Sequence, residues 1–111
     1  MSEGSTAQEL FDELAAEQLI RPEVTKGLML QAESLRFDGK SFAFVSKERL
    51  FLKVPAVRVD EMVGTGEGLH CEIGGRRMRE WVVVLATGAP EDRTRWRALL
   101  AESAAFVATL P

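Results

Sequence analysis

The stretch Gly74–Leu85 reads GGRRMREWVVVL, and it indicates the kind of fold that this chain adopts. Paired glycines suit the left-handed dihedral angles of a two-residue hairpin turn. The valine-rich run that follows the turn is typical of a β-strand. Residues 70–73, HCEI, supply a strand before the turn. This stretch therefore predicts a β-hairpin, which is the commonest element of an antiparallel sheet.

Signals on both sides of this hairpin predict the remaining elements. Asp38–Gly39 is a second turn pair of the same kind between apolar segments. The pair Thr6 and Glu9 has the form of a capping box before apolar residues at helical spacing. The expected strands cover residues 28–37, 42–45, 50–54, 70–73 and 76–85, and 21–27 interrupt the pattern. The expected helices cover about 7–19, a short segment from Pro55 to Val63, and a last segment that starts at 90 or 91 and reaches 110.

The order of these elements is helix, three strands, helix, two strands, helix. This order predicts an α+β protein with an antiparallel sheet of about five strands and helices packed on one face. A length of 111 residues is enough for one hydrophobic core without disulfides or a structural metal. We expect a single domain over residues 6–111 and a flexible tail over residues 1–5.

Composition and charge narrow the class of protein. Hydrophobic residues make up 46% and charged residues 28% of the chain, and no apolar run is long enough to span a membrane. The start of the chain lacks the features of a secretory signal, which predicts a cytoplasmic protein. Residues 1–23 hold six acids and one arginine, so the remaining 88 residues carry a net charge of +2. This weak basic bias disfavours nucleic acid as the main partner without excluding it.

The candidate binding residues are the arginines of the opening stretch and the tryptophan that follows them. Arg76, Arg77 and Arg79 offer guanidinium groups that match carboxylate or phosphate oxygens. Strand alternation places Arg77, Arg79 and Trp81 on one face and Met78 on the other. One interpretation is a solvated or acid-paired strand face, with Trp81 anchored in the core beneath a helix. The other is an exposed site in which Trp81 and the arginines contact a partner.

Nothing else in the chain has the pattern of a catalytic or cofactor site. His70 and Cys71 are adjacent, but neighbours in a strand point to opposite faces and do not readily share a proton. A single cysteine and a single histidine cannot make a zinc site. We therefore expect no enzymatic activity, no cofactor and no metal.

Several segments together resemble the N-terminal domain of the TfoX/Sxy family. The resemblance covers residues 28–111, and its most specific part is the set Gly75, Arg76, Met78, Trp81 and Val82. The other segments are Met29 with Asp38–Gly39 nine residues later, FAFV (42–45), RLFLKV (49–54) and the terminal FVATLP (106–111). The chain departs from the family at Gln31–Ala32, where a diglycine is usual. A weaker likeness to YjbR-like proteins covers only the last strand and helix.

The resemblance implies a small α+β domain that occurs alone or joined to a second helical domain. It links the family to regulation of competence for DNA uptake in some bacteria, and it supplies no catalytic residues. The chain stops at Pro111, so we expect a stand-alone member. The leading hypothesis is a regulatory module that binds a protein partner through Arg76, Arg77, Arg79 and Trp81. The alternatives are nucleic-acid binding through that strand with Arg93, Arg95 and Arg97, or a ligand-binding or enzymatic domain. A homodimer paired through an edge strand is also left open.

Overall fold

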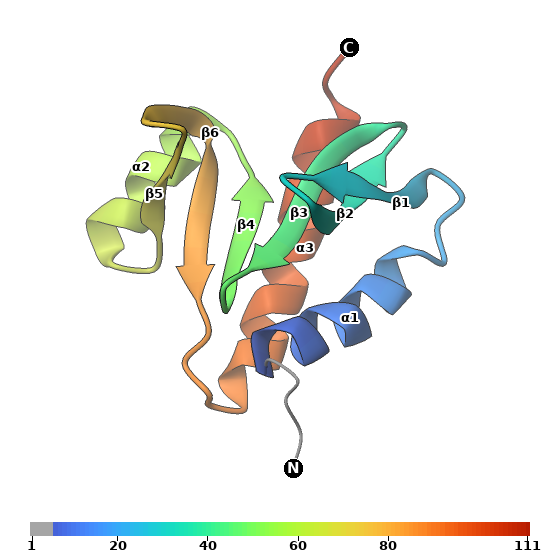
Figure 1. The fold of residues 1–111 in the computed structure, drawn as a ribbon, viewed down its shortest axis with the longest axis horizontal. Helices are drawn as coiled ribbons and strands as arrows, with labels where there is room; N and C mark the ends of the chain where they lie inside the picture. Colours follow the sequence, from blue (N-terminus) through green and yellow to red (C-terminus); the bar gives the residue numbers. More distant parts are fainter. Residues whose placement is uncertain (1–5) are drawn as a thin grey trace.

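A computed structural model describes residues 6–111, in which three helices accompany a six-stranded antiparallel sheet (Figure 1). The α+β class and the order of the elements confirm the prediction, whereas six strands replace the expected five or so. The expected tail over residues 1–5 and the side chain of Thr6, with its capping box, lie outside the described residues. The elements are α1 (Thr6–Gln18), β1 (Val24–Met29), β2 (Ala32–Phe37), β3 (Lys40–Ser46), β4 (Arg49–Lys53), α2 (Ala56–Thr65), β5 (Leu69–Ile73), β6 (Arg76–Leu85) and α3 (Glu91–Ala108).

The additional strand comes from the segment predicted as one strand over 28–37. The chain turns within this segment, so β1 and β2 form a hairpin, and β1 begins in the stretch 21–27 that was expected to interrupt the pattern. The turn residues Leu30 and Gln31 both have left-handed φ angles, of 53° and 67°. Neither residue is one that such turns favour, so the sequence carries no turn signal at this point.

The other hairpins use the same backbone geometry. Left-handed residues occupy Asp38–Gly39 between β2 and β3, Lys47–Glu48 between β3 and β4, and Gly74–Gly75 between β5 and β6. Two left-handed residues in succession match the right-handed twist of the strands that they join. Glycine adopts this conformation at no steric cost, but other residues are strained there by roughly 1–2 kcal/mol each. The turns at 30–31 and 47–48 each hold two such residues, whereas the turn at 38–39 holds only Asp38, a residue type that tolerates this conformation better.

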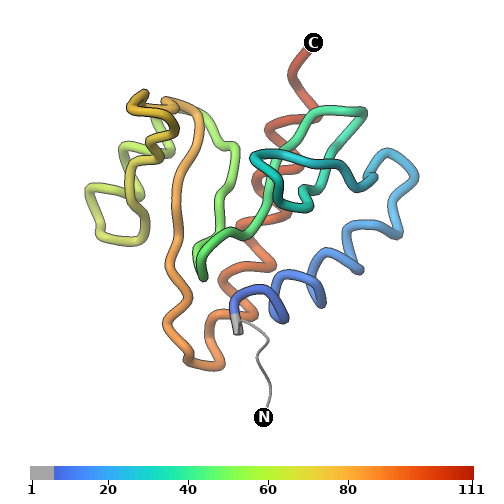
Figure 2. Tube along the Cα trace, in the orientation of Figure 1, coloured from blue at the N-terminus to red at the C-terminus, as the bar shows by residue number. Residues whose placement is uncertain are grey.

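The strands lie in the order β1-β2-β3-β4-β6-β5, and β1 and β5 are the edges. β4 pairs with β6, with Leu50 opposite Val84 and Leu52 opposite Val82. After β4 the chain forms α2 and then the edge strand β5. It next forms β6, which lies between β4 and β5, as the trace in Figure 2 shows. The β5–β6 hairpin consequently stands at one end of the molecule.

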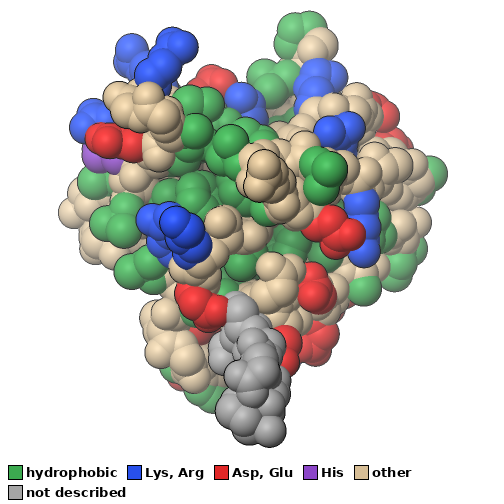
Figure 3. All heavy atoms as spheres, viewed as in Figure 1, with side chains coloured by type: hydrophobic (Ala, Val, Ile, Leu, Met, Phe, Trp, Pro, Cys, Tyr) green, Lys and Arg blue, Asp and Glu red, His purple; other side chains and the backbone are tan. Residues whose placement is uncertain are grey.

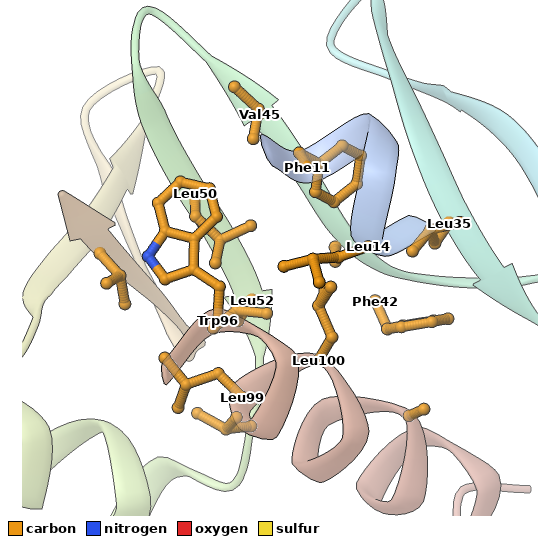
Figure 4. Packing of buried hydrophobic residues seen from close by; sticks show 14 of the residues in the cluster. Phe11, Leu14, Leu35, Phe42, Val45, Leu50, Leu52, Trp96, Leu99 and Leu100 are labelled. Atoms are coloured by element: carbon orange, nitrogen blue, oxygen red, sulfur yellow. The ribbon is translucent and has the colours of Figure 1, made fainter. Parts of the chain in front are cut away.

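One face of the sheet carries the main core, which we call the helix-side core. Leu50 and Leu52 point to this face and pack against Trp96 and Leu100 of α3 (Figure 4). Val82 of β6 belongs to the same cluster. Phe11 and Leu14 of α1 and Val59 and Met62 of α2 belong to the same cluster. All three helices thus cover one face, as predicted. Truncating a leucine in such a core to alanine typically costs about 2–5 kcal/mol of stability.

The opposite face carries a second group, the open-face cluster, formed by Phe44, Phe51, Cys71, Trp81 and Val83. The rings of Phe44 and Phe51 stack with centroids 4.5 Å apart, and Trp81 lies 5.8 Å from Phe44. The Lys53 ammonium lies 5.7 Å from the Trp81 ring centroid. These side chains bury one another without a helix, since the helices of residues 6–111 lie on the other face.

The glycine-rich connection after α2 has a packing role. Gly66 ends the helix in a left-handed conformation with φ of 84°. A Cβ atom on Gly68 would lie 2.6 Å from a methyl carbon of Val82, which is closer than van der Waals contact allows. Glycine at position 68 therefore lets the chain pass directly over the core strand β6.

Candidate partner-binding site

The tip of the β5–β6 hairpin presents the arginines of the opening stretch. Arg76, Arg77 and Arg79 are exposed, and their side chains form no ion pair or hydrogen bond with any residue from 6 to 111. Glu72 is opposite Arg77 in the strand register, yet the two charged groups are not paired. Figure 3 shows Lys and Arg side chains gathered at the upper left, over this end of the molecule. The hairpin therefore holds positive charge that the described chain does not neutralise.

The predicted shared face of Arg77, Arg79 and Trp81 is wrong. The register places Val82 opposite His70 but Met78 opposite Cys71, so residues 79–81 form an irregularity in β6 that resets the alternation. Met78 packs against the open-face cluster that contains Trp81, whereas Arg77 and Arg79 also reach the helix side, where they line a pocket with Val59 of α2. Trp81 is only 5% exposed, and it is an anchor, but on the face without helices rather than beneath one.

Two pockets meet at Arg77 and Arg79. The first, which we call the α2 pocket, has a volume of about 380 Å³ and lies between α2 and the hairpin. Its lining residues are Ala56, Val59, Asp60, His70, Arg77 and Arg79. The second, the Trp81 pocket, has a volume of about 480 Å³. Its lining residues are Lys53, Ala56, Arg77, Met78, Arg79, Glu80 and Trp81. The two arginines thus separate a polar pocket from one that also offers an aromatic ring.

The charges around the Trp81 pocket are unevenly matched. Lys53 and Glu80 form an ion pair with 3.6 Å between Nζ and the carboxylate oxygen. Arg77 and Arg79 remain unpaired beside them. A partner that brings carboxylates to this rim and an apolar group to Trp81 would satisfy both the charges and the ring.

The arginines of α3, by contrast, are bound within the molecule. Arg93 donates to Glu13 across 2.6 Å and Arg97 donates to Glu17 across 2.9 Å, which ties α3 to α1. These hydrogen bonds lower the pKa of Glu13 and of Glu17 and outweigh desolvation, which acts in the opposite direction. The α3 arginines are therefore committed to the fold.

Arg95, the third arginine of α3, belongs to a network around the buried carboxylate of Asp92. Asp92 accepts hydrogen bonds from the backbone N–H groups of Thr87 and Gly88 at 2.9 and 3.0 Å, and from the Thr87 hydroxyl at 2.8 Å. Arg95 donates at 3.0 Å. Burial alone would raise the pKa of Asp92, but the bonds from Thr87, Arg95 and Gly88 together outweigh burial and lower it. The network fixes the loop that leads into α3.

His70 and Cys71 do not form a reactive pair in this structure. His70 lines the α2 pocket, while Cys71 is buried in the open-face cluster on the other side of the sheet. Burial raises the pKa of the Cys71 thiol, partly offset by the positive charge of Arg49. A thiol in this setting is a poor nucleophile. Within residues 6–111, no group of three or more His, Cys, Asp or Glu side chains is arranged to hold a metal ion.

Comparison with protein-family models, with curated proteins and with solved structures gives no significant match to this chain. The TfoX/Sxy resemblance therefore stays a prediction. None of the helices over the described residues is long and apolar enough to cross a membrane.

Sequence reasoning missed three side chains that surround the predicted arginines. Asp60 comes from α2, Lys53 from the end of β4, and His70 from the edge strand β5. No local motif marks them, because they meet the arginines only through the strand order and the packing of α2. The adjacent pair His70 and Cys71 was a local pattern that included one of them, and it pointed to thiol–imidazole chemistry and not to a pocket beside the arginines.

Proposed function

We propose that this domain is a non-enzymatic regulatory module that binds an acidic segment of a protein partner through Arg76, Arg77 and Arg79. The observation that carries the proposal is the unpaired state of these exposed arginines in a molecule whose α3 arginines are all ion-paired. Guanidinium groups bind carboxylates with two parallel hydrogen bonds, so each arginine can hold one acidic side chain. The Trp81 pocket supplies an apolar contact beside them.

The paired state of the α3 arginines favours a protein partner over nucleic acid. A nucleic-acid surface built from β6 together with Arg93, Arg95 and Arg97 would have to break the ion pairs of those three residues first. The overall charge of −3 also opposes a polyanion. Binding to an acidic segment needs only the local charge of the hairpin, and rim charges of this kind mainly steer association and set specificity.

The proposal extends to the family and the cellular setting. A domain of the TfoX N-terminal type, acting in the cytoplasm as a regulator, agrees with the motif around Gly75, Met78 and Trp81. A single reduced cysteine such as Cys71 is ordinary in that compartment. Regulation of competence is the role that the resemblance suggests, and the identity of the partner is what would test it.

The decisive experiment is capture of partners from the native cytoplasm with the wild type and with the double variant Arg77→Glu/Arg79→Glu. The matched control is Arg21→Glu/Lys47→Glu, which makes the same charge change at exposed positions remote from the hairpin. We expect a nuclease-resistant protein that the control retains and the hairpin variant loses. The captured protein is then identified and its binding measured with purified components.

Three results would contradict the proposal. Equal capture by the hairpin variant would remove the hairpin as the contact surface. Equal loss of the captured protein in the control variant would show that the effect depends on net charge and not on the hairpin. Recovery of nucleic acid that nuclease abolishes, with affinity that falls steeply as salt rises, would favour the nucleic-acid alternative.

A further inference from the structure

The α2 pocket differs from the rest of the surface in the chemistry that it gathers. Its polar groups come from three separate elements: Asp60 from α2, His70 from β5, and Arg77 and Arg79 from β6. The remaining walls are the small apolar side chains of Ala56 and Val59. Arg77 and Arg79 both line the pocket, so their two positive charges lie beside the same space. The pocket therefore combines two neighbouring cations with a donor imidazole in a space of about 380 Å³.

The two guanidinium groups in the pocket have no anion of their own. Neither Arg77 nor Arg79 forms a hydrogen bond or ion pair with the described chain, and Asp60, which shares the pocket, is not within ion-pair distance of either. Adjacent like charges repel one another, and an anion held between them removes that repulsion. The His70 ring can add an N–H donor in either protonation state.

We propose that the α2 pocket binds a phosphate monoester group, held by Arg77 and Arg79 with a hydrogen bond from His70. Such a group carries close to two negative charges near neutral pH and three strongly accepting oxygens, which suits two guanidinium groups and one imidazole donor. A carboxylate has one charge and two oxygens, so it fills fewer of these donors. The inference goes beyond the proposed function because the site exists without the partner.

Substitution of Asp60 distinguishes binding in this pocket from general charge screening. Its carboxylate faces the same pocket and repels a bound anion. Replacing Asp60 with asparagine keeps the size of the side chain and removes the repulsion. Phosphate binding should then become tighter by about threefold. An anion held near the exposed arginines only by general charge screening would respond far less to the loss of this single carboxylate.

The experiment is a titration of the purified domain with inorganic phosphate at constant ionic strength, with chloride replaced as phosphate is added. Nuclear magnetic resonance follows the Arg Nε–H and backbone amide signals. We expect saturable shifts at Arg77, Arg79 and His70. Arg77→Gln and Arg79→Gln should each weaken binding by about tenfold, since a charge-assisted hydrogen bond is lost. The matched control is Lys47→Gln, which removes an exposed positive charge that does not line the pocket and lies outside the proposed contact surface.

The source of the phosphate group is distinguished by two further ligands. One is a peptide that contains phosphoserine, and the other is the same peptide with unmodified serine. Tighter binding of the phosphopeptide than of inorganic phosphate identifies a phosphorylated protein as the source, and equal binding identifies a small phosphorylated molecule.

Defined outcomes overturn the proposal. Shifts that grow linearly without saturation, or an equal loss in Lys47→Gln and Arg77→Gln, would show that the effect is general charge screening. Unchanged or weaker binding by Asp60→Asn would contradict the placement of the anion in this pocket. Circular dichroism of each variant checks that the fold is intact. The titration contains no partner, so it can fail while partner capture succeeds, and the reverse also holds.

Discussion

Residues 93–97 at the start of α3 and residues 76–79 at the start of β6 each carry three arginines. The α3 set is neutralised by Glu13, Asp92 and Glu17. The β6 set has no acidic partner among the described residues. In sequence both stretches look like basic clusters. In the folded protein one set holds two helices and a loop together, and the other set is free to bind.

The difference between the two sets arises from tertiary packing. Glu13 and Glu17 lie 80 residues before their arginine partners and reach them only because α1 packs beside α3. The β5–β6 hairpin stands at an end of the sheet, where α2 packs against it and no acidic side chain of the described residues pairs with its arginines. A cluster of arginines therefore suggests a binding surface only where the folded chain supplies no acidic partners for it.

The largest effect in this comparison should follow from Asp92→Ala. The substitution leaves Arg95 and the N–H groups of Thr87 and Gly88 without their acceptor in a partly buried position. We expect the free energy of unfolding to fall by about 2–3 kcal/mol. Urea denaturation of the wild type and the variant measures the change. A loss below about 0.5 kcal/mol would show that the network contributes little to stability.

Acid should remove the same contribution without a mutation. The pKa of Asp92 is lowered from its ordinary 3.8, and hydrogen bonds from arginines lower the pKa of Glu13 and Glu17 from 4.5. Since the folded state binds these protons less tightly than the unfolded state, the stabilisation is complete above those ordinary values and is lost as pH falls through the folded ones. Urea midpoints measured from neutral pH downward should drop in this window. Asp92→Ala should show a smaller drop, and an identical pH profile would contradict the assignment.

Charge reversal in α3 should have a smaller effect. Arg93→Glu/Arg97→Glu places like charges beside Glu13 and Glu17, so the melting temperature should decrease, and added salt should reduce the decrease. Reversing the acids as well, with Glu13→Arg/Glu17→Arg in the same chain, should restore most of the loss. Differential scanning calorimetry follows all three proteins. No recovery in the fourfold variant would show that these pairs do not couple α1 to α3.

The smallest effect on stability is expected for the β6 set. Arg77→Glu/Arg79→Glu removes no interaction within the described chain, so the free energy of unfolding should stay within about 0.5 kcal/mol of the wild type. Urea denaturation is again the measurement. A larger loss would mean that these arginines stabilise the fold, and the contrast between the two sets would disappear.

Much of the fold could be predicted from local signals, and the exceptions have physical causes. Asp38–Gly39 and Gly74–Gly75 marked two hairpins because glycine tolerates left-handed angles. The hairpin at Leu30–Gln31 was missed because its residues adopt those angles under strain, which composition does not reveal.

The candidate site was predicted less completely than the fold. Arg76, Arg77 and Arg79 were singled out as candidates from their clustering in the sequence. The position of Trp81 relative to them was wrong, because strand alternation fails across the irregularity at residues 79–81. The pairing of the α3 arginines and the contribution of Asp60 to the α2 pocket depend on contacts between distant elements, which local patterns do not encode.

The burial of Cys71 allows local opening of the open-face cluster to be measured by thiol labelling of the unmodified protein. It is the only cysteine in the chain and is 1% exposed inside the open-face cluster. A thiol-specific reagent can react with it only when this cluster opens. The rate of labelling therefore measures how often the cluster opens. Because the cluster is separate from the helix-side core, labelling can reveal whether the face without helices opens before the molecule unfolds as a whole. An added probe is not needed, and a binding partner seated over the Trp81 pocket would slow the reaction.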